Sequence, residues 1–150
     1  MTGNDLLEVY RKLVLEHSKQ PHNQGKPEAF DFSAQGFNPL CGDKITVYVN
    51  VDNDHITSLR FDGSGCAISM ASASMMTVAL QKASAEDARQ SIEALNKLLK
   101  EGTPLTNERM SDLNALEGVR SYPSRIKCAT LAWSTMDAAL NNNDDLISTE

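Results

Sequence analysis

The chain has 150 residues, of which 41% are hydrophobic, and a formal net charge of -6 from 14 Lys and Arg against 20 Asp and Glu residues. This length fits one compact domain, which we place at 1–140, followed by a flexible tail at 141–150. The acidic balance argues against a nucleic-acid partner, because phosphate-binding surfaces depend on clustered positive charge. No stretch approaches the ~20 apolar residues of a membrane span and no signal-peptide pattern is present, so we expect a cytoplasmic protein without a membrane partner.

The first 63 residues are expected to form one helix and a small sheet. Apolar residues recur at helical spacing over 5–19 and predict an amphipathic helix. The stretch "QPHNQGKPEAF" contains two prolines and a glycine, which predicts a long loop. Alternating apolar residues predict strands at 45–51 and 55–63, joined as a hairpin by "DND", and phenylalanines favour a short third strand near 30–37.

The rest of the chain is predicted to be helical. Residues 66–81 are rich in Ala, Ser and Met and carry no charge, which predicts a helix buried on most sides. Ser84 and Asp87 resemble a capping box, and the helix that they open should run to Lys100. Strands followed by a run of helices predict an α+β fold, with a small antiparallel sheet of about three strands packed against several helices.

Two further helices are expected toward the C-terminal end. One short helix covers 107–117, and Pro123 suits the first position of the last helix. The last helix carries an apolar stripe made by Ile126, Ala129, Trp133, Met136 and Leu140. Cys128 lies roughly 110 degrees from the middle of this stripe, so we expect it at the border of the core.

Each of the three cysteines falls at a junction between predicted elements. Cys41 precedes a strand, Cys66 follows "GSG" where a helix begins, and Cys128 lies in the early turns of the last helix. In a reducing cytosol such thiols pack, bind metal or react more often than they form disulfides. Simple packing is the alternative reading, because a free cysteine is among the most buried residue types.

Three thiolates and one carboxylate would satisfy a tetrahedral zinc ion, and Asp43 is the candidate for the fourth ligand. The spacing alone does not decide this, because the intervals are long and the C-x-x-C knuckle is absent. The rival ligands are the histidines. His17 lies on the apolar stripe of the first helix, where a core or capping role is more common, while His22 lies in the loop and His55 opens a strand.

Three segments together resemble one family. "NPLCGD", "GSGCAISMASASMM" and "YPSRIKCATLAW" are similar to the three cysteine motifs of the U-type iron-sulfur assembly proteins, IscU and SufU, and they occur in the family's order. "EHSKQPHNQG" also resembles the family's His-x-x-x-Pro-x-x-x-Gly loop, so the resemblance extends over nearly all of residues 5–140.

The departures from the family pattern indicate the SufU branch. Classical scaffolds of the family carry a histidine immediately before the last cysteine, where this chain has Lys127, and "SYPSRIK" replaces their Leu-Pro-Pro-Val-Lys segment. The stretch between the second and third cysteines is also longer than in classical scaffolds. It is consistent with the insertion of the SufU branch, here the helix and loop around 84–106.

The resemblance implies a zinc-bound sulfurtransferase that takes persulfide sulfur from a PLP-dependent cysteine desulfurase of the SufS type. The sulfur would pass to downstream iron-sulfur scaffold proteins for cluster assembly. By motif, the zinc ligands would be Cys41, Asp43, Cys66 and Cys128, with Cys41 as the sulfur acceptor. Arg125, one turn before Cys128, could steady the anionic sulfur or pair with the desulfurase, or it could be a solvated helix arginine.

Two other functions remain open at this stage. The same ligands could hold iron or an iron-sulfur cluster, which would make the protein a transient scaffold for cluster assembly. A closed site with four ligands could also be purely structural, in a domain that binds a partner without chemistry. Exposure of Cys41 would separate transfer from a structural site, because a transferring thiolate must be reachable from solvent.

Overall fold

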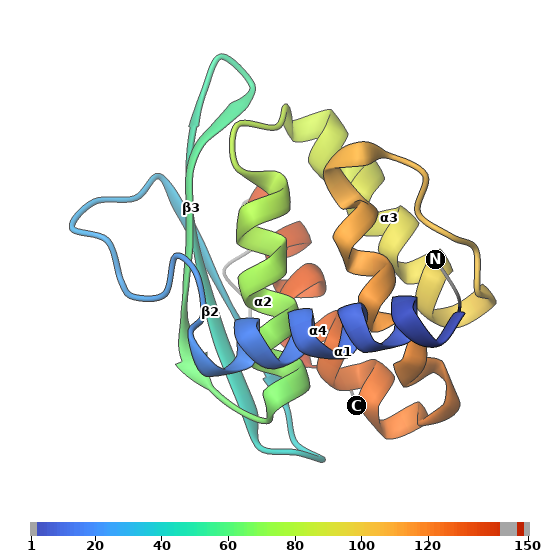
Figure 1. Cartoon of the computed structure of the whole chain (residues 1–150). Coiled ribbons are helices and arrows are strands. Elements are labelled where there is room, and N and C mark those ends of the chain that lie inside the picture. Colours follow the sequence, from blue (N-terminus) through green and yellow to red (C-terminus); the bar gives the residue numbers. More distant parts are fainter. Residues whose placement is uncertain (1–2, 142–146, 149–150) are drawn as a thin grey trace.

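The structure is a computed structural model that describes residues 3–141 and 147–148, and it has the predicted α+β architecture. In chain order the elements are α1 (Gly3–Lys19), β1 (Phe32–Asn38), β2 (Asp43–Asp52), β3 (His55–Ser64), α2 (Ala67–Leu80), α3 (Ala85–Glu101), the 3-10 helix η1 (Glu108–Ser121), α4 (Pro123–Leu140) and β4 (Ile147–Ser148). Figure 1 shows the sheet as one layer, with the helices stacked on one side of it. None of the described helices is long and apolar enough to cross a bilayer.

Three antiparallel strands form the main part of the sheet, as predicted. The strand order is β3-β2-β1-β4, and β2 pairs with both β1 and β3. Asn53 and Asp54 connect β2 to β3 with φ angles of 51° and 63°, the left-handed conformation that suits a tight hairpin turn. Most of the predicted tail at 141–150 lies outside the described residues, although the two residues of β4 pair in parallel with Gly36 and Phe37 of β1.

The helix α2 lies at the centre of the helical layer, where it contacts α1, α4, η1 and β3. Its small residues permit this close packing, and all but three of its residues are buried. Hydrogen bonds also tie α2 to α4: Ser72 Oγ accepts from Trp133 Nε1 at 2.9 Å and donates to the Ala129 carbonyl at 2.6 Å. The prediction that this helix is buried on most sides is confirmed.

The helix α4 is more deeply buried than its sequence indicates. It packs against β1, β2, α2, α3 and η1, so almost every side chain from Cys128 to Ala139 is buried rather than a single stripe. Cys128 itself is 0% exposed. The expectation that Cys128 borders the core is therefore wrong, because neighbouring elements cover α4 on several sides.

Two helical segments follow α2, and local signals predict one better than the other. Ser84 caps α3 by accepting a 3.0 Å hydrogen bond from the Asp87 backbone N–H, and Gly102 ends the helix with φ 78°, as the capping-box reading predicts. The segment predicted as a short helix at 107–117 is instead a 3-10 helix that extends to Ser121. Its buried residues recur every three positions, which matches three residues per turn: Met110, Leu113, Leu116 and Val119.

His17 fixes the end of α1 against α2. Its Nδ1 lies 2.7 Å from Ser74 Oγ, which also accepts a 2.7 Å hydrogen bond from the His22 backbone N–H. Ser74 Oγ can accept from His22 and at the same time donate its hydroxyl proton to His17 Nδ1, so the contact is compatible with a neutral imidazole. His17 is only 9% exposed and is a core histidine, as its place on the apolar stripe predicts.

This contact predicts a loss of stability on mild acidification. Burial holds the pKa of His17 below 6.5, and His22 lowers it further. Asp112 and Glu16 act in the opposite direction. A depressed pKa means that His17 takes up its proton first in the unfolded chain. The stabilisation of the fold by neutral His17 is therefore complete above about pH 6.5 and is lost as the pH falls below it.

Urea unfolding between about pH 7.5 and pH 5.5 should therefore show a steeper fall in the free energy of unfolding for the wild type than for His17→Gln. The exposed His55 offers the matched control in His55→Gln. If the free energy of unfolding fell equally steeply with pH in the wild type and in His17→Gln, this role of His17 would be contradicted.

Candidate metal centre

Cys41 lies in the tight connection between β1 and β2, and Asp43 begins β2 two residues later. The strands pair up to Asn38 and Asp43, which are opposite each other, and only four residues join them. Gly42 has a φ of 70°, a conformation that glycine adopts without strain, and this places Cys41 on an exposed turn. Asp43, in contrast, is 0% exposed although it is the first residue of its strand.

The other two cysteines reach the same corner from helices. Cys66 is the N-cap residue of α2 and is half-buried, and Cys128 lies in the second turn of α4 and is fully buried. The junction positions predicted for the three cysteines are thus confirmed. One turn, one helix start and one buried helix face converge at the end of β1.

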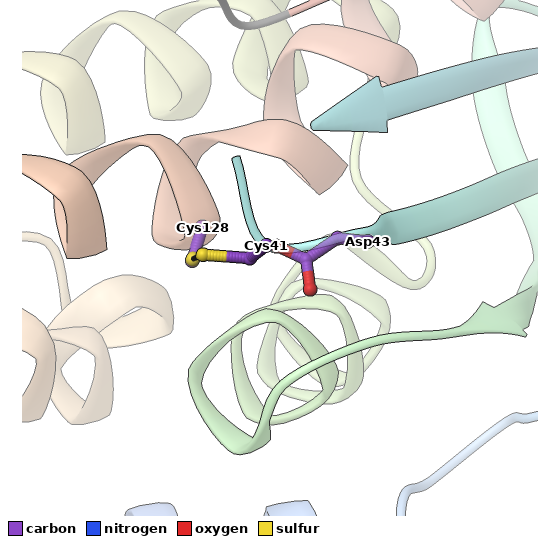
Figure 2. A group of neighbouring side chains, drawn as sticks. All are labelled: Cys41, Asp43 and Cys128. Atoms are coloured by element: carbon purple, nitrogen blue, oxygen red, sulfur yellow. Dashed lines mark hydrogen bonds between the residues drawn. The ribbon is translucent and has the colours of Figure 1, made fainter. Parts of the chain in front are cut away.

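Three of the four predicted ligands form a compact group. One ligand atom from each of Cys41, Asp43 and Cys128 lies within 4.8 Å of the other two, and the Cys128 thiol donates to Cys41 Sγ at 3.2 Å. Figure 2 shows the two sulfurs next to each other, with the Asp43 carboxylate directed toward the start of α2. Cys66 lies beside this group: its Sγ is 4.0 Å from Asp43 Oδ2, but it is not among the residues whose ligand atoms all lie within 4.8 Å of one another.

The donor types fit a zinc site. Two sulfurs bound at ~2.3 Å to a tetrahedral zinc ion lie about 3.8 Å apart, whereas Cys41 Sγ and Cys128 Sγ lie 3.2 Å apart, so these two sulfurs would have to separate slightly around an ion. Thiolates and a carboxylate are ligands that zinc accepts, and four of them complete a tetrahedral shell.

The Asp43 carboxylate is held by neutral donors. Its Oδ1 accepts a 2.8 Å hydrogen bond from the Cys66 backbone N–H, and its Oδ2 accepts from Asn38 Nδ2 at 3.0 Å. The ion pairs found in the described residues, Lys97–Glu93 and Arg120–Glu117, lie elsewhere. A buried carboxylate without a cationic partner is costly, so this corner is electrostatically suited to a cation.

The protein part of the site disfavours additional negative charge. Burial raises the pKa of the Cys128 thiol above its usual range. Hydrogen bonds with Cys41, Cys66 and Asp43 raise this pKa further. A divalent cation at the same position would reverse the effect, because it stabilises the thiolates that bind it.

The remaining predicted residues lie outside the compact group. Arg125 is in the first turn of α4, where its backbone N–H donates to the Tyr122 carbonyl at 2.8 Å and its side chain is exposed. His17 is engaged with Ser74, and His55 Nδ1 lies 3.0 Å from the Asn53 carbonyl. The metal-ligating group found in the described residues contains no histidine.

Two residues of this corner were missed by the sequence reasoning. Asn38 is fully buried and contacts both Asp43 and Cys128, yet nothing in its local sequence distinguishes it from a turn asparagine. Gly65 precedes the N-cap of α2, and a Cβ atom added there would collide with Asp43 Oδ1. The "GSG" segment before Cys66 is the signal that could have indicated such a close approach.

The crowding at Gly65 predicts that Gly65→Ala is destabilising. The added methyl group would displace the Asp43 carboxylate from its hydrogen bonds, and we expect a loss of about 1–3 kcal/mol in the free energy of unfolding. Gly118→Ala is the matched control, because a Cβ at Gly118 meets nothing within 4 Å. Urea unfolding of both variants checks this, and equal stabilities would show that the carboxylate can move aside without cost.

The sequence is similar to those of known proteins. Residues 9–129 match the NifU-like N terminal domain. The zinc-dependent sulfurtransferase SufU of Bacillus subtilis is 36% identical over 129 residues, covering 86% of this chain and 87% of that protein. The iron-sulfur cluster assembly scaffold protein IscU of Streptococcus pyogenes is 35% identical over 143 residues, covering 95% of this chain and 89% of that protein.

A solved structure agrees with these relatives. The N-terminal part of a NifU-like protein from Brucella abortus superposes with a TM-score of 0.83 at 26% identity, over 91% of this chain and 95% of that one. The family model, the two relatives and the solved structure therefore indicate the same family over most of the sequence. The chain belongs to the U-type family of iron-sulfur cluster assembly proteins, built on the NifU-like N terminal domain.

Proposed function

We propose that this protein is a zinc-bound sulfur acceptor, which takes persulfide sulfur from a PLP-dependent cysteine desulfurase and delivers it for iron-sulfur cluster synthesis. Cys41, Asp43, Cys66 and Cys128 would hold the zinc ion, and Cys41 would accept the sulfur. The observation that carries the proposal is the unequal exposure of the donors. Cys41 lies on an exposed turn, whereas Asp43 and Cys128 are fully buried.

Exposure and backbone context both favour Cys41 as the acceptor. Cys41 lies in a surface connection, a type of segment that is generally more mobile than a helix, whereas the backbone of Cys128 is held inside α4. A bound zinc ion would keep the thiols deprotonated without adding redox chemistry of its own. The ordinary thiol-disulfide exchange rules then apply to the exposed sulfur.

The transfer step is a thiolate substitution at sulfur. The Cys41 thiolate attacks the outer sulfur of the desulfurase persulfide, so one S–S bond forms on Cys41 while the S–S bond within the desulfurase breaks. The desulfurase cysteine leaves as a thiolate, and the number of electrons is conserved without any external oxidant. A second substitution of the same kind would pass the sulfur to a downstream scaffold protein.

Arg125 is proposed to assist this step from the first turn of α4. Its exposed guanidinium carries a permanent positive charge one turn before Cys128. Such a group can pair with an anionic sulfur or with a carboxylate of the desulfurase of the SufS type.

Scaffolding is the second candidate function, because the Streptococcus pyogenes relative is named as a cluster assembly scaffold and covers 95% of this chain. In that case the same four residues would hold iron or an iron-sulfur cluster. Anaerobic incubation with ferrous iron and sulfide separates the two candidates. A chain that assembles a stable cluster but acquires no persulfide on Cys41 would be a scaffold.

Metal analysis is the first test of the proposed site. We expect one zinc ion per chain in the purified protein, and removal by a chelator should lower the melting temperature by about 5–10 °C. The reason is that the unfolded chain lacks the assembled site, so binding free energy adds to folding free energy. A metal-free protein whose melting temperature did not respond to zinc would refute the site.

Peptide mass mapping tests the acceptor. After incubation with a cysteine desulfurase and free cysteine, we expect about 32 Da of added mass on Cys41. Cys41→Ser should abolish the rise in desulfurase turnover. Added sulfur on Cys66 or Cys128 alone would contradict the assignment. In the same assay Arg125→Ala should slow transfer, while Arg120→Ala, in η1, serves as its control.

A further inference from the structure

Asn38 is a fully buried amide that contacts two of the proposed ligands. It is the last residue of β1 and lies opposite Asp43 in the β1–β2 pair. Its Nδ2 donates to Asp43 Oδ2 at 3.0 Å and to Cys128 Sγ at 3.5 Å. A single side chain thus directs its amide hydrogens to groups on two different elements, β2 and α4.

The other end of the same amide is unsatisfied. Asn38 Oδ1 is buried and has no hydrogen-bond partner among the described residues. An unpaired buried acceptor carries a desolvation penalty. Rotating the amide would not relieve it, because the oxygen would then face the Asp43 carboxylate, which only accepts hydrogen bonds. An apolar side chain would avoid this penalty but would take a donor from the buried Asp43 carboxylate and from the Cys128 sulfur, so the use of the asparagine lies in these two contacts.

We propose that Asn38 is a positioning residue of the metal centre, which holds Asp43 and Cys128 in place as metal ligands. The inference rests on the proposed metal-binding function. A donor to a ligand atom fixes its orientation and tunes its interaction with the metal, as partners in the second shell of metal sites do. Here one amide would do so for a carboxylate and a sulfur at once.

The donors are distributed unequally over the site. Asp43 receives hydrogen bonds from Asn38 and from the Cys66 backbone, and Cys128 receives one from Asn38. The contact recorded for Cys41 Sγ is the Cys128 thiol. Asn38 thereby distinguishes two ligands that stay in place from the exposed ligand that is free to react.

The test compares zinc affinity in Asn38→Leu and in the wild type. The leucine has a similarly branched shape but donates no hydrogen bond. We expect zinc affinity, measured by competition with a chromophoric chelator, to fall about 10–100-fold. Cobalt(II) substituted for zinc should show a shifted sulfur-to-metal charge-transfer band in the variant, because the Cys128 sulfur loses its donor. A merely structural role for Asn38 would not move that band.

Ser69→Ala is the matched control. Ser69 Oγ is also buried without a partner, and it lies in α2 only three residues after Cys66. Its removal should leave the affinity and the cobalt spectrum unchanged. Asn38→Ser is the second variant, which keeps one hydroxyl donor in a smaller side chain and should bind zinc with intermediate affinity. If Asn38→Leu does not fold, the zinc affinity and cobalt spectrum of Asn38→Ser test the role of Asn38.

The outcomes separate this inference from the proposed function. A wild-type chain that binds neither zinc nor cobalt would refute the metal centre as a whole. If the wild type binds and both Asn38 variants match it in affinity and spectrum, only the role of Asn38 is overturned. The same holds if Ser69→Ala weakens binding as much as Asn38→Leu, because the effect would then follow from any buried polar deletion.

Discussion

The buried carboxylate of Asp43 is the constraint on which this corner of the fold depends. It begins β2, yet it is fully buried and accepts hydrogen bonds from the start of α2 and from the end of β1. A buried charge needs compensation by donors or by a cation. The two neutral donors supply part of it, and because they come from the end of β1 and the start of α2, one side chain links these elements to β2.

The two glycines before α2 allow a close approach to β2, and one of them adjoins the Asp43 carboxylate. A Cβ atom at Gly65 would collide with the Asp43 carboxylate, and one at Gly63, where φ is 140°, would collide with the Lys44 carbonyl. The chain must therefore pass close to the backbone and side chain of β2 before it can place Cys66 at the N-cap of α2. Gly65 thus leaves room for the Asp43 carboxylate and Gly63 for the Lys44 backbone, and the chain reaches Cys66 close to both.

Local sequence signals predicted the helices and strands well, whereas they could not predict the contacts between segments that are distant in the sequence. The turn at Asn53 and the cap at Ser84 depend on residues within a few positions, and both agree with the structure. The short helix predicted at 107–117 is a 3-10 helix, because its apolar residues recur every three positions, a spacing that over a short segment is compatible with both kinds of helix. The burial of Cys128 and the contacts of Asn38 depend on how α4 packs against the sheet, which no single segment encodes.

A closed set of four zinc ligands is usually structural, so a reactive role requires one ligand that differs from the others. In the proposed site that ligand is Cys41, because its turn is exposed while Cys128 is fully buried within α4. Lys127, beside Cys128, offers hydrogen-bond donors but no lone pair when charged, so it adds no fifth ligand. The half-buried Cys66 is held at a helix start by the bond between its own N–H and Asp43. A partner's persulfide would therefore meet the metal centre through Cys41, and the buried donors would determine how firmly the rest of the site stays in place during that encounter.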